Sequence, residues 1–169
     1  MSNFVISDTH FNHNNIINYC KRPFNNVLEM NRRLIENWNN IISEDDTVFH
    51  VGDFGFGSRE LISDILRMLN GKKVLIISNH DIQKVNANIK LGFNDVYKKE
   101  FILDNFIFTH FPLEYVPSDY INIHGHVHNT YFKQYDTDFH INVSADLINF
   151  TPVNLDNIHN IKNNYKYLE

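Results

Sequence analysis

Seven side chains with oxygen or nitrogen donors stand at or just after the ends of short apolar runs. Asp-x-His follows Phe4–Ser7, Gly-Asp follows Thr47–Val51, and Asn-His-Asp follows Lys73–Ser78. A histidine ends the run Asn105–Thr109, and His-x-His ends the run Ile121–Gly125. In an α/β sheet, ligands bind outside the carboxyl ends of the strands, so we expect these donors to gather at one edge. The donors are Asp8, His10, Asp53, Asn79, His110, His126 and His128.

This donor set predicts a metal site. It offers carboxylate, amide and imidazole groups and no thiolate, which suits Mn²⁺ foremost, with Fe, Zn²⁺, Ni²⁺ or Mg²⁺ as alternatives, and argues against a cysteine-rich zinc site. Seven ligands are too many for one tetrahedral ion, but they suit two ions that share Asp53. Two ions about 3.5–4 Å apart can clamp the attacking and leaving oxygens of a phosphoryl transfer.

The first half of the chain predicts an alternating order of strands and helices. Apolar residues at spacings of three and four indicate a helix from Val27 to Ile41 and another after Ser58, a plausible N-cap. A short helix capped by Asn14 or Asn15 precedes them, and one over roughly Ile82 to Lys90 follows. The order β-α-α-β-α-β-α is typical of parallel crossovers.

The second half predicts short strands. Asp104-Asn105 is a hairpin signal between strands at 99–103 and 106–109. Further strands are expected at 121–123, 131–135 and 139–143, with antiparallel pairing. Thr151-Pro152 would end the sheet region and a terminal helix would follow. We predict an α/β (mixed α+β) fold, a four-layer αββα sandwich of two mixed sheets flanked by helices, in one domain over residues 1–169 without a cap domain.

Composition narrows the function classes. The net charge is −5 and no Lys/Arg run occurs, so long duplex nucleic acid is a disfavoured partner. No apolar run approaches the roughly 20 residues of a membrane helix, and no signal-peptide pattern opens the chain. We therefore expect a cytoplasmic protein, of a bacterium or a phage-infected host. The one cysteine, Cys20, is expected to be a small buried apolar residue. The sequence does not predict the oligomeric state.

The order Asp-x-His, Gly-Asp, Asn-His-Asp, His and Gly-His-x-His resembles the calcineurin-like metallophosphoesterase superfamily, and its small bacterial and phage phosphoesterases in particular. The resemblance spans the chain from Asp8 to His128 and implies the same sandwich fold. It implies that one metal is held by Asp8, His10, Asp53 and His128. It implies that the other metal is held by Asp53, Asn79, His110 and His126.

The same resemblance implies a mechanism. A metal-bridging hydroxide would be the nucleophile, because divalent metals lower the pKa of bound water toward ~7. His80 would protonate the leaving oxygen or stabilise the charged transition state, and Asp81 would orient His80. His13 could face the substrate or be structural. Arg22 could meet a phosphate or be an ordinary solvated arginine.

Two departures from the family pattern stand out. Ser78 occupies the position of the family's usual glycine, and it would strain the turn if that position needs a positive φ. The segment Phe54–Gly57 lacks the Asp-Arg-Gly of the protein Ser/Thr phosphatases, which disfavours phosphoprotein phosphatase activity.

We predict a metal-dependent phosphoesterase acting on small phosphodiesters or nucleotide-like substrates, since no cluster of Arg or Lys stands out to neutralise a monoester. The alternatives are a phosphomonoesterase, a nuclease on single strands, and a non-catalytic metal- or nucleotide-binding protein. His50 is expected to be a hydrogen-bonded core residue, and His124 either structural or a support for a ligand. The aromatic residues that could stack a nucleobase or pack on the core are Tyr115, Tyr120, Tyr131 and Tyr135.

Overall fold

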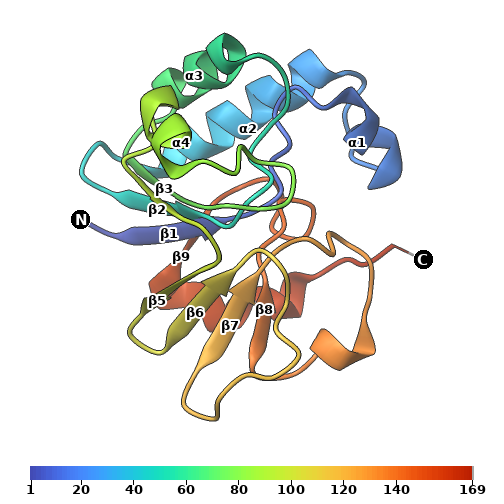
Figure 1. Ribbon diagram of the computed structural model, residues 1–169. Helices are drawn as coiled ribbons and strands as arrows, with labels where there is room; N and C mark the ends of the chain where they lie inside the picture. Colours follow the sequence, from blue (N-terminus) through green and yellow to red (C-terminus); the bar gives the residue numbers. More distant parts are fainter. Residues whose placement is uncertain (169) are drawn as a thin grey trace.

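A computed structural model describes residues 1–168 and consists of two mixed β-sheets packed face to face (Figure 1). The strands β1 to β4 run parallel, and β9 pairs antiparallel with β1. In spatial order the first sheet comprises β4 (Asp95–Tyr97), β3 (Lys72–Ile76), β2 (Thr47–His50), β1 (Asn3–Ile6) and β9 (Val153–Asn154).

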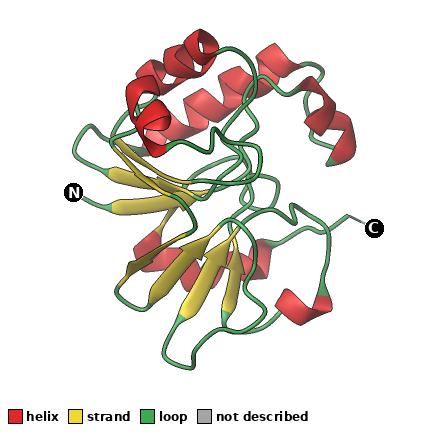
Figure 2. Ribbon diagram, viewed as in Figure 1, coloured by secondary structure: helices red, strands yellow, loops and turns green. Residues whose placement is uncertain are grey.

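Helices connect the parallel strands of the first sheet. They are α1 (Asn14–Tyr19), α2 (Val27–Ile41), α3 (Arg59–Met68) and α4 (Val85–Leu91). Helices α2, α3 and α4 cover the face of the first sheet that points away from the second, whereas α1 lies to one side (Figures 1 and 2). The Ser58 side chain accepts a hydrogen bond from Leu61 N, which confirms the predicted cap of α3. The cap predicted for α1 is wrong, because α1 already begins at Asn14 and its N-cap His13 makes no capping bond.

The second sheet holds the strands of the second half, in the order β5 (Glu100–Leu103), β6 (Phe106–Thr109), β7 (Ile121–His124) and β8 (His140–Asn142). The hairpin at Asp104-Asn105 is confirmed, but β6, β7 and β8 are parallel to one another, so the expected run of antiparallel pairs is wrong. The strand expected at 131–135 is instead a 3-10 turn, η1 (Lys133–Tyr135). There Tyr135 packs its ring beside His124 and His140, so the segment covers the sheet and does not extend it.

Aromatic side chains fill the space between the two sheets. The ring of Phe49 on β2 stacks on Phe101 at 5.3 Å and on Phe108 at 5.1 Å.

The terminal helix forms as a 3-10 helix, η2 (Leu155–Asn164), and packs beside β1, β8 and β9. Because β9 follows Pro152, the sheet does not end there as predicted. The two mixed sheets with flanking helices confirm the predicted fold class. Within residues 1–168, no helix has both the length and the apolar character needed to cross a bilayer.

The two sheets meet where their parallel strands end. Just beyond β1, Ser7 N donates to Val143 O at 2.9 Å, and Ala145 N donates to Ser7 O at 2.9 Å. The carboxyl ends of strands from both sheets are therefore brought together. The predicted ligands follow these ends.

Candidate metal centre

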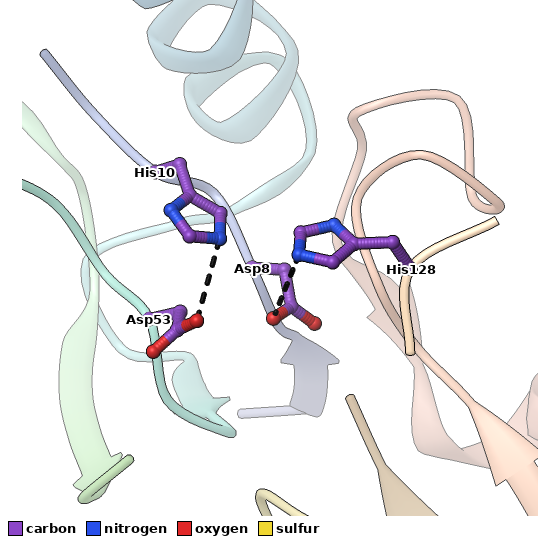
Figure 3. A group of neighbouring side chains, drawn as sticks. All are labelled: Asp8, His10, Asp53 and His128. Carbon is purple, nitrogen blue, oxygen red and sulfur yellow. Dashed lines mark ion pairs between the residues drawn. The ribbon is translucent and has the colours of Figure 1, made fainter. Parts of the chain in front are cut away.

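Four predicted ligands from three separate parts of the chain gather in one cluster (Figure 3). Asp8, His10, Asp53 and His128 each offer one ligand atom, and these atoms all lie within 4.8 Å of one another. The imidazole of His10 points at Asp53, with Nε2 3.4 Å from Oδ2, and His128 Nε2 lies 3.8 Å from Asp8 Oδ1. All four belong to the set that the family resemblance assigns to one metal.

A second group of predicted ligands adjoins the first through Asp53. His110 Nε2 lies 3.7 Å from Asp53 Oδ1, so His10 and His110 lie next to different oxygens of the same carboxylate. The rings of His110 and His126 are 5.1 Å apart. Asn79 is exposed just after β3, next to Ser78, whose hydroxyl accepts from Asp53 N at 3.0 Å. Asp53 thus lies between His10 of the first group and His110 of the second.

Unpaired polar atoms at this junction fit a bound cation. Within residues 1–168, His10 Nε2, Asp53 Oδ1 and His110 Nε2 are buried and have no hydrogen-bond partner. A buried polar atom without a partner costs roughly 1–3 kcal/mol. Divalent cations on the two sides of Asp53 would satisfy these atoms, and imidazole nitrogen with carboxylate oxygen is a donor set that such ions accept.

Burial and neighbouring charges shift the pKa values of these groups in ways that favour binding of a cation. Burial lowers the pKa of His10 to about 2, which leaves the imidazole neutral with a free lone pair. Burial opposes ionisation of Asp8, yet the neighbouring His128, His110 and His10 hold its pKa well below the usual range. The pKa of Asp53 is raised, by burial first and then by the charge of Asp8. Crowded carboxylates of this kind favour an added positive charge.

The backbone at the cluster has positive φ angles, which residues other than glycine rarely adopt. Asp8, His10, Asp53, His126 and His128 all have φ between 50° and 71°. Residues other than glycine in this region cost about 1–3 kcal/mol each and concentrate at functional sites. By contrast, Ser78 does not belong to this positive-φ set, so it does not strain the turn as the comparison with the family's glycine allowed.

Gly125 is needed for a close approach of two segments. A Cβ at this position would lie 2.0 Å from Ser7 Oγ and 2.3 Å from Asp8 Oδ2. With no side chain there, His126 N can donate to Asp8 Oδ2 at 3.0 Å. The glycine of the Gly-His-x-His block therefore allows the hydrogen bond that helps to position Asp8.

Arg22 and Asp146 form a buried ion pair behind the cluster. Arg22 Nε lies 2.8 Å from Asp146 Oδ1, and the guanidinium also donates to the carbonyl oxygens of Asp8 and Thr9. Asp146 Oδ2 in turn lies 2.8 Å from His128 Nδ1. The guanidinium is thus neither solvated nor open to a substrate, which corrects both expectations for Arg22. Sequence reasoning missed Asp146, and no spacing to the other ligands marked it.

Ser78 and Asp81 hold the loop that carries Asp53. The Ser78 hydroxyl donates to Asp81 Oδ2 at 2.7 Å and accepts from the backbone N–H groups of Asp53, His80 and Asp81. Asp81 also accepts from Asp53 N and Phe54 N, at 3.0 and 3.1 Å. Its carboxylate therefore positions the backbone of Asp53 and does not orient the His80 ring as predicted.

His80 and His13 lie at the open side of the cluster. His80 is exposed, with its ring 6.5 Å from that of His10 and 5.5 Å from that of Phe56. The His13 ring packs 4.2 Å from Phe56, and its Nδ1 lies 3.3 Å from His10 Nδ1. Both imidazoles can therefore reach a molecule held at the cluster. Phe56, which touches three of these histidine rings, was not singled out from the sequence.

The other histidines have structural partners. His50 is fully buried and its Nε2 lies 2.9 Å from Thr9 Oγ1, as expected of a core group. His124 Nδ1 lies 3.0 Å from Gly125 O, which favours the structural alternative. Ser144, which donates to Asp8 Oδ2 at 2.8 Å, supports the ligand in the way that had been considered for His124.

Comparisons with known proteins place the chain among relatives. No family model matches the sequence. The chain is 40% identical over 161 residues to the uncharacterized protein MJ1445 of Methanocaldococcus jannaschii, covering 90% of this chain and 86% of that protein. The crystal structure of AQ665 from Aquifex aeolicus, a protein of unknown function, is similar with a TM-score of 0.73 at 25% identity, covering 95% of this chain and 98% of that one. The chain therefore belongs to the family of the Methanocaldococcus jannaschii protein MJ1445.

Proposed function

We propose that this protein is a metal-dependent phosphoesterase of the calcineurin-like type with a dinuclear centre. The observation that carries the proposal is the position of Asp53 between His10 and His110, each near a different oxygen of its carboxylate. His10 Nε2, His110 Nε2 and Asp53 Oδ1 are buried and, in the part of the chain that the structure describes, have no hydrogen-bond partner. A shared carboxylate flanked by imidazoles is the arrangement that two adjacent ions need.

Each group has a proposed role. One ion would be held by Asp8, His10, Asp53 and His128, and the other by Asp53, Asn79, His110 and His126. Two bound divalent ions, Mn²⁺ foremost, would offset the charge of the phosphate oxygens and lower the pKa of a water molecule. His80, exposed beside the cluster, would give a proton to the leaving oxygen or donate a hydrogen bond to the phosphate. His13, next to His10, would contact the substrate.

The distribution of cations favours diesters over monoesters. A monoester carries up to two negative charges, and its recognition is helped by an arginine that can bind two oxygens at once. Arg22 is the arginine nearest in sequence to the first ligands, but it is committed to Asp146 and to two backbone carbonyls. Arg59 lines a separate pocket of about 180 Å³ with His80 and Phe56, and within residues 1–168 none of the seven predicted ligands lines that pocket.

A substrate panel combined with elemental analysis tests the proposal. The panel would hold p-nitrophenyl phosphate, bis(p-nitrophenyl) phosphate, cyclic nucleotides, dinucleotides and single strands, each with Mn²⁺ and with chelator. We expect two metal ions per chain and hydrolysis that is faster on diesters and stops with chelator. Two bound metals without turnover on any substrate would favour the non-catalytic binding protein. Failure to bind metal would overturn the proposal altogether.

A further inference from the structure

Phe111 places an exposed aromatic ring directly beside two predicted metal ligands. Its side chain is 48% exposed, although large apolar residues are usually buried. The ring lies 4.2 Å from that of His126 and 5.1 Å from that of His110. One face of this part of the metal centre is therefore bordered by an accessible phenyl ring.

Buried polar side chains hold the backbone around Phe111 in one conformation. Thr109 Oγ1 donates to Phe111 O at 2.7 Å and accepts from Asn122 Nδ2 at 2.8 Å. Asn122, which is fully buried, also accepts from Leu113 N at 2.9 Å. His110 O also accepts from Gly125 N at 3.1 Å, so the backbone is fixed on both sides of Phe111. An exposed ring on a fixed backbone loses less conformational freedom when a ligand packs against it than a ring on a mobile loop.

The tyrosines that the sequence offered for stacking lie elsewhere. Tyr135 packs against His124 and His140, and Tyr131 packs against Tyr167. Tyr115 is 78% exposed and lies four positions beyond Phe111. None of these three rings, nor that of Tyr120, is paired with a predicted ligand ring within residues 1–168, whereas Phe111 is paired with two.

We propose that Phe111 stacks the nucleobase of the substrate, so that the substrates are nucleotide phosphodiesters. The inference rests on the phosphoesterase function proposed above and names its substrate class. Every base has a π-face, and a fixed aromatic ring binds it without a charged side chain. This mode of recognition suits a protein with a net charge of −5 whose buried arginine beside the cluster is already paired.

Two esters with the same leaving group test the proposal. Thymidine 5′-(p-nitrophenyl phosphate) carries a base, and methyl p-nitrophenyl phosphate does not. For the Mn²⁺-loaded protein we expect kcat/KM to favour the thymidine ester. Phe111→Ala should lower that preference roughly 5- to 150-fold, through KM, as loss of one base–aromatic stack would. Phe111→Tyr should keep the preference, Phe111→Leu should lose most of it, and Tyr115→Ala is the matched control that should keep it.

A binding measurement separates this inference from the proposed function. Stacking quenches the fluorescence of a 2-aminopurine nucleoside monophosphate, which can be titrated with the Mg²⁺-loaded protein without turnover. Quenching that is lost in Phe111→Ala supports the stacking role even if neither ester is hydrolysed. The absence of hydrolysis would contradict only the phosphoesterase function. An equal loss of activity on both esters in Phe111→Ala, or an unchanged preference, would overturn the stacking role of Phe111, and the proposed phosphoesterase function of the wild-type protein would still stand.

Discussion

The Nδ1 atom of His128 lies 2.8 Å from Asp146 Oδ2, on the side of the imidazole away from Asp8. Although burial opposes protonation of His128, the charge of Asp8 and the hydrogen bond that His128 donates to Asp146 raise its pKa to about 11. A carboxylate that accepts from Nδ1 directs Nε2 toward a metal and makes it a better donor. Because Arg22 binds both Asp146 and the carbonyl of Asp8, one ion pair fixes two predicted ligands that are 120 positions apart in the sequence.

Asp146→Asn should weaken metal binding at the His128 side. The amide keeps the shape of the side chain but loses the charge that orients and polarises His128. We expect the affinity for one of two Mn²⁺ ions to fall roughly 10- to 100-fold, as measured by calorimetric titration of the chelator-treated protein. Asp104→Asn, in the exposed hairpin, is the matched control. Thermal unfolding of both variants without metal separates lost affinity from lost folding, and unchanged affinity in Asp146→Asn would contradict the role.

His80→Ala and Asp53→Asn should affect different steps. His80 lies beside the cluster, so its loss should leave two metals bound while hydrolysis falls roughly 10²- to 10⁴-fold. Asp53 lies between His10 and His110, so Asp53→Asn should reduce the metal content itself. Elemental analysis beside initial rates distinguishes the two variants. If His80→Ala lost as much metal as Asp53→Asn, the division of roles would be wrong.

Ser78→Gly, which introduces the residue usual in the resembling family, should destabilise this protein. The serine hydroxyl donates to Asp81 and accepts from the N–H of Asp53, and glycine can do neither. We expect a loss of about 1–3 kcal/mol in the free energy of unfolding, measured by urea denaturation. Ser78→Thr, which keeps the hydroxyl, and Ser63→Gly in α3, which reports the general effect of a new glycine, are the comparisons. Equal stability of Ser78→Gly and wild type would show that the hydroxyl is dispensable.

His50 should make stability depend on pH. Burial lowers its pKa to about 4, against the opposing charges of Asp81 and Asp8. Between pH 6.5 and about 4 the unfolded chain binds a proton at His50 that the folded protein does not. Stability from this group is therefore complete above pH 6.5 and is lost as the pH falls, by up to about 1.4 kcal/mol per pH unit. Urea unfolding of chelator-treated wild type and His50→Gln should give a shallower pH dependence for the variant. Parallel curves would rule out this contribution.

Local sequence signals were sufficient for much of the fold. The spacing of apolar residues predicted α2, the Asp104-Asn105 turn predicted the β5–β6 hairpin, and Ser58 was predicted as a cap. Each of these depends on contacts within a few residues. The prediction of a strand at 131–135 was wrong because Tyr135 packs against residues on β7 and β8. The local sequence pattern does not indicate contacts with such distant residues.

For the candidate metal centre, the sequence by itself determined which donors are present and that they follow strand ends, because chain direction and parallel pairing place such residues at one edge. Only the tertiary structure decided what supports them. Arg22 meets Asp146 across 124 positions and Ser144 meets Asp8 across 136, and Asp81 binds the backbone of Asp53 and not the ring of His80. Such pairs form because buried charges and hydroxyls must find a partner wherever packing brings one, and that requirement leaves no spacing in the sequence.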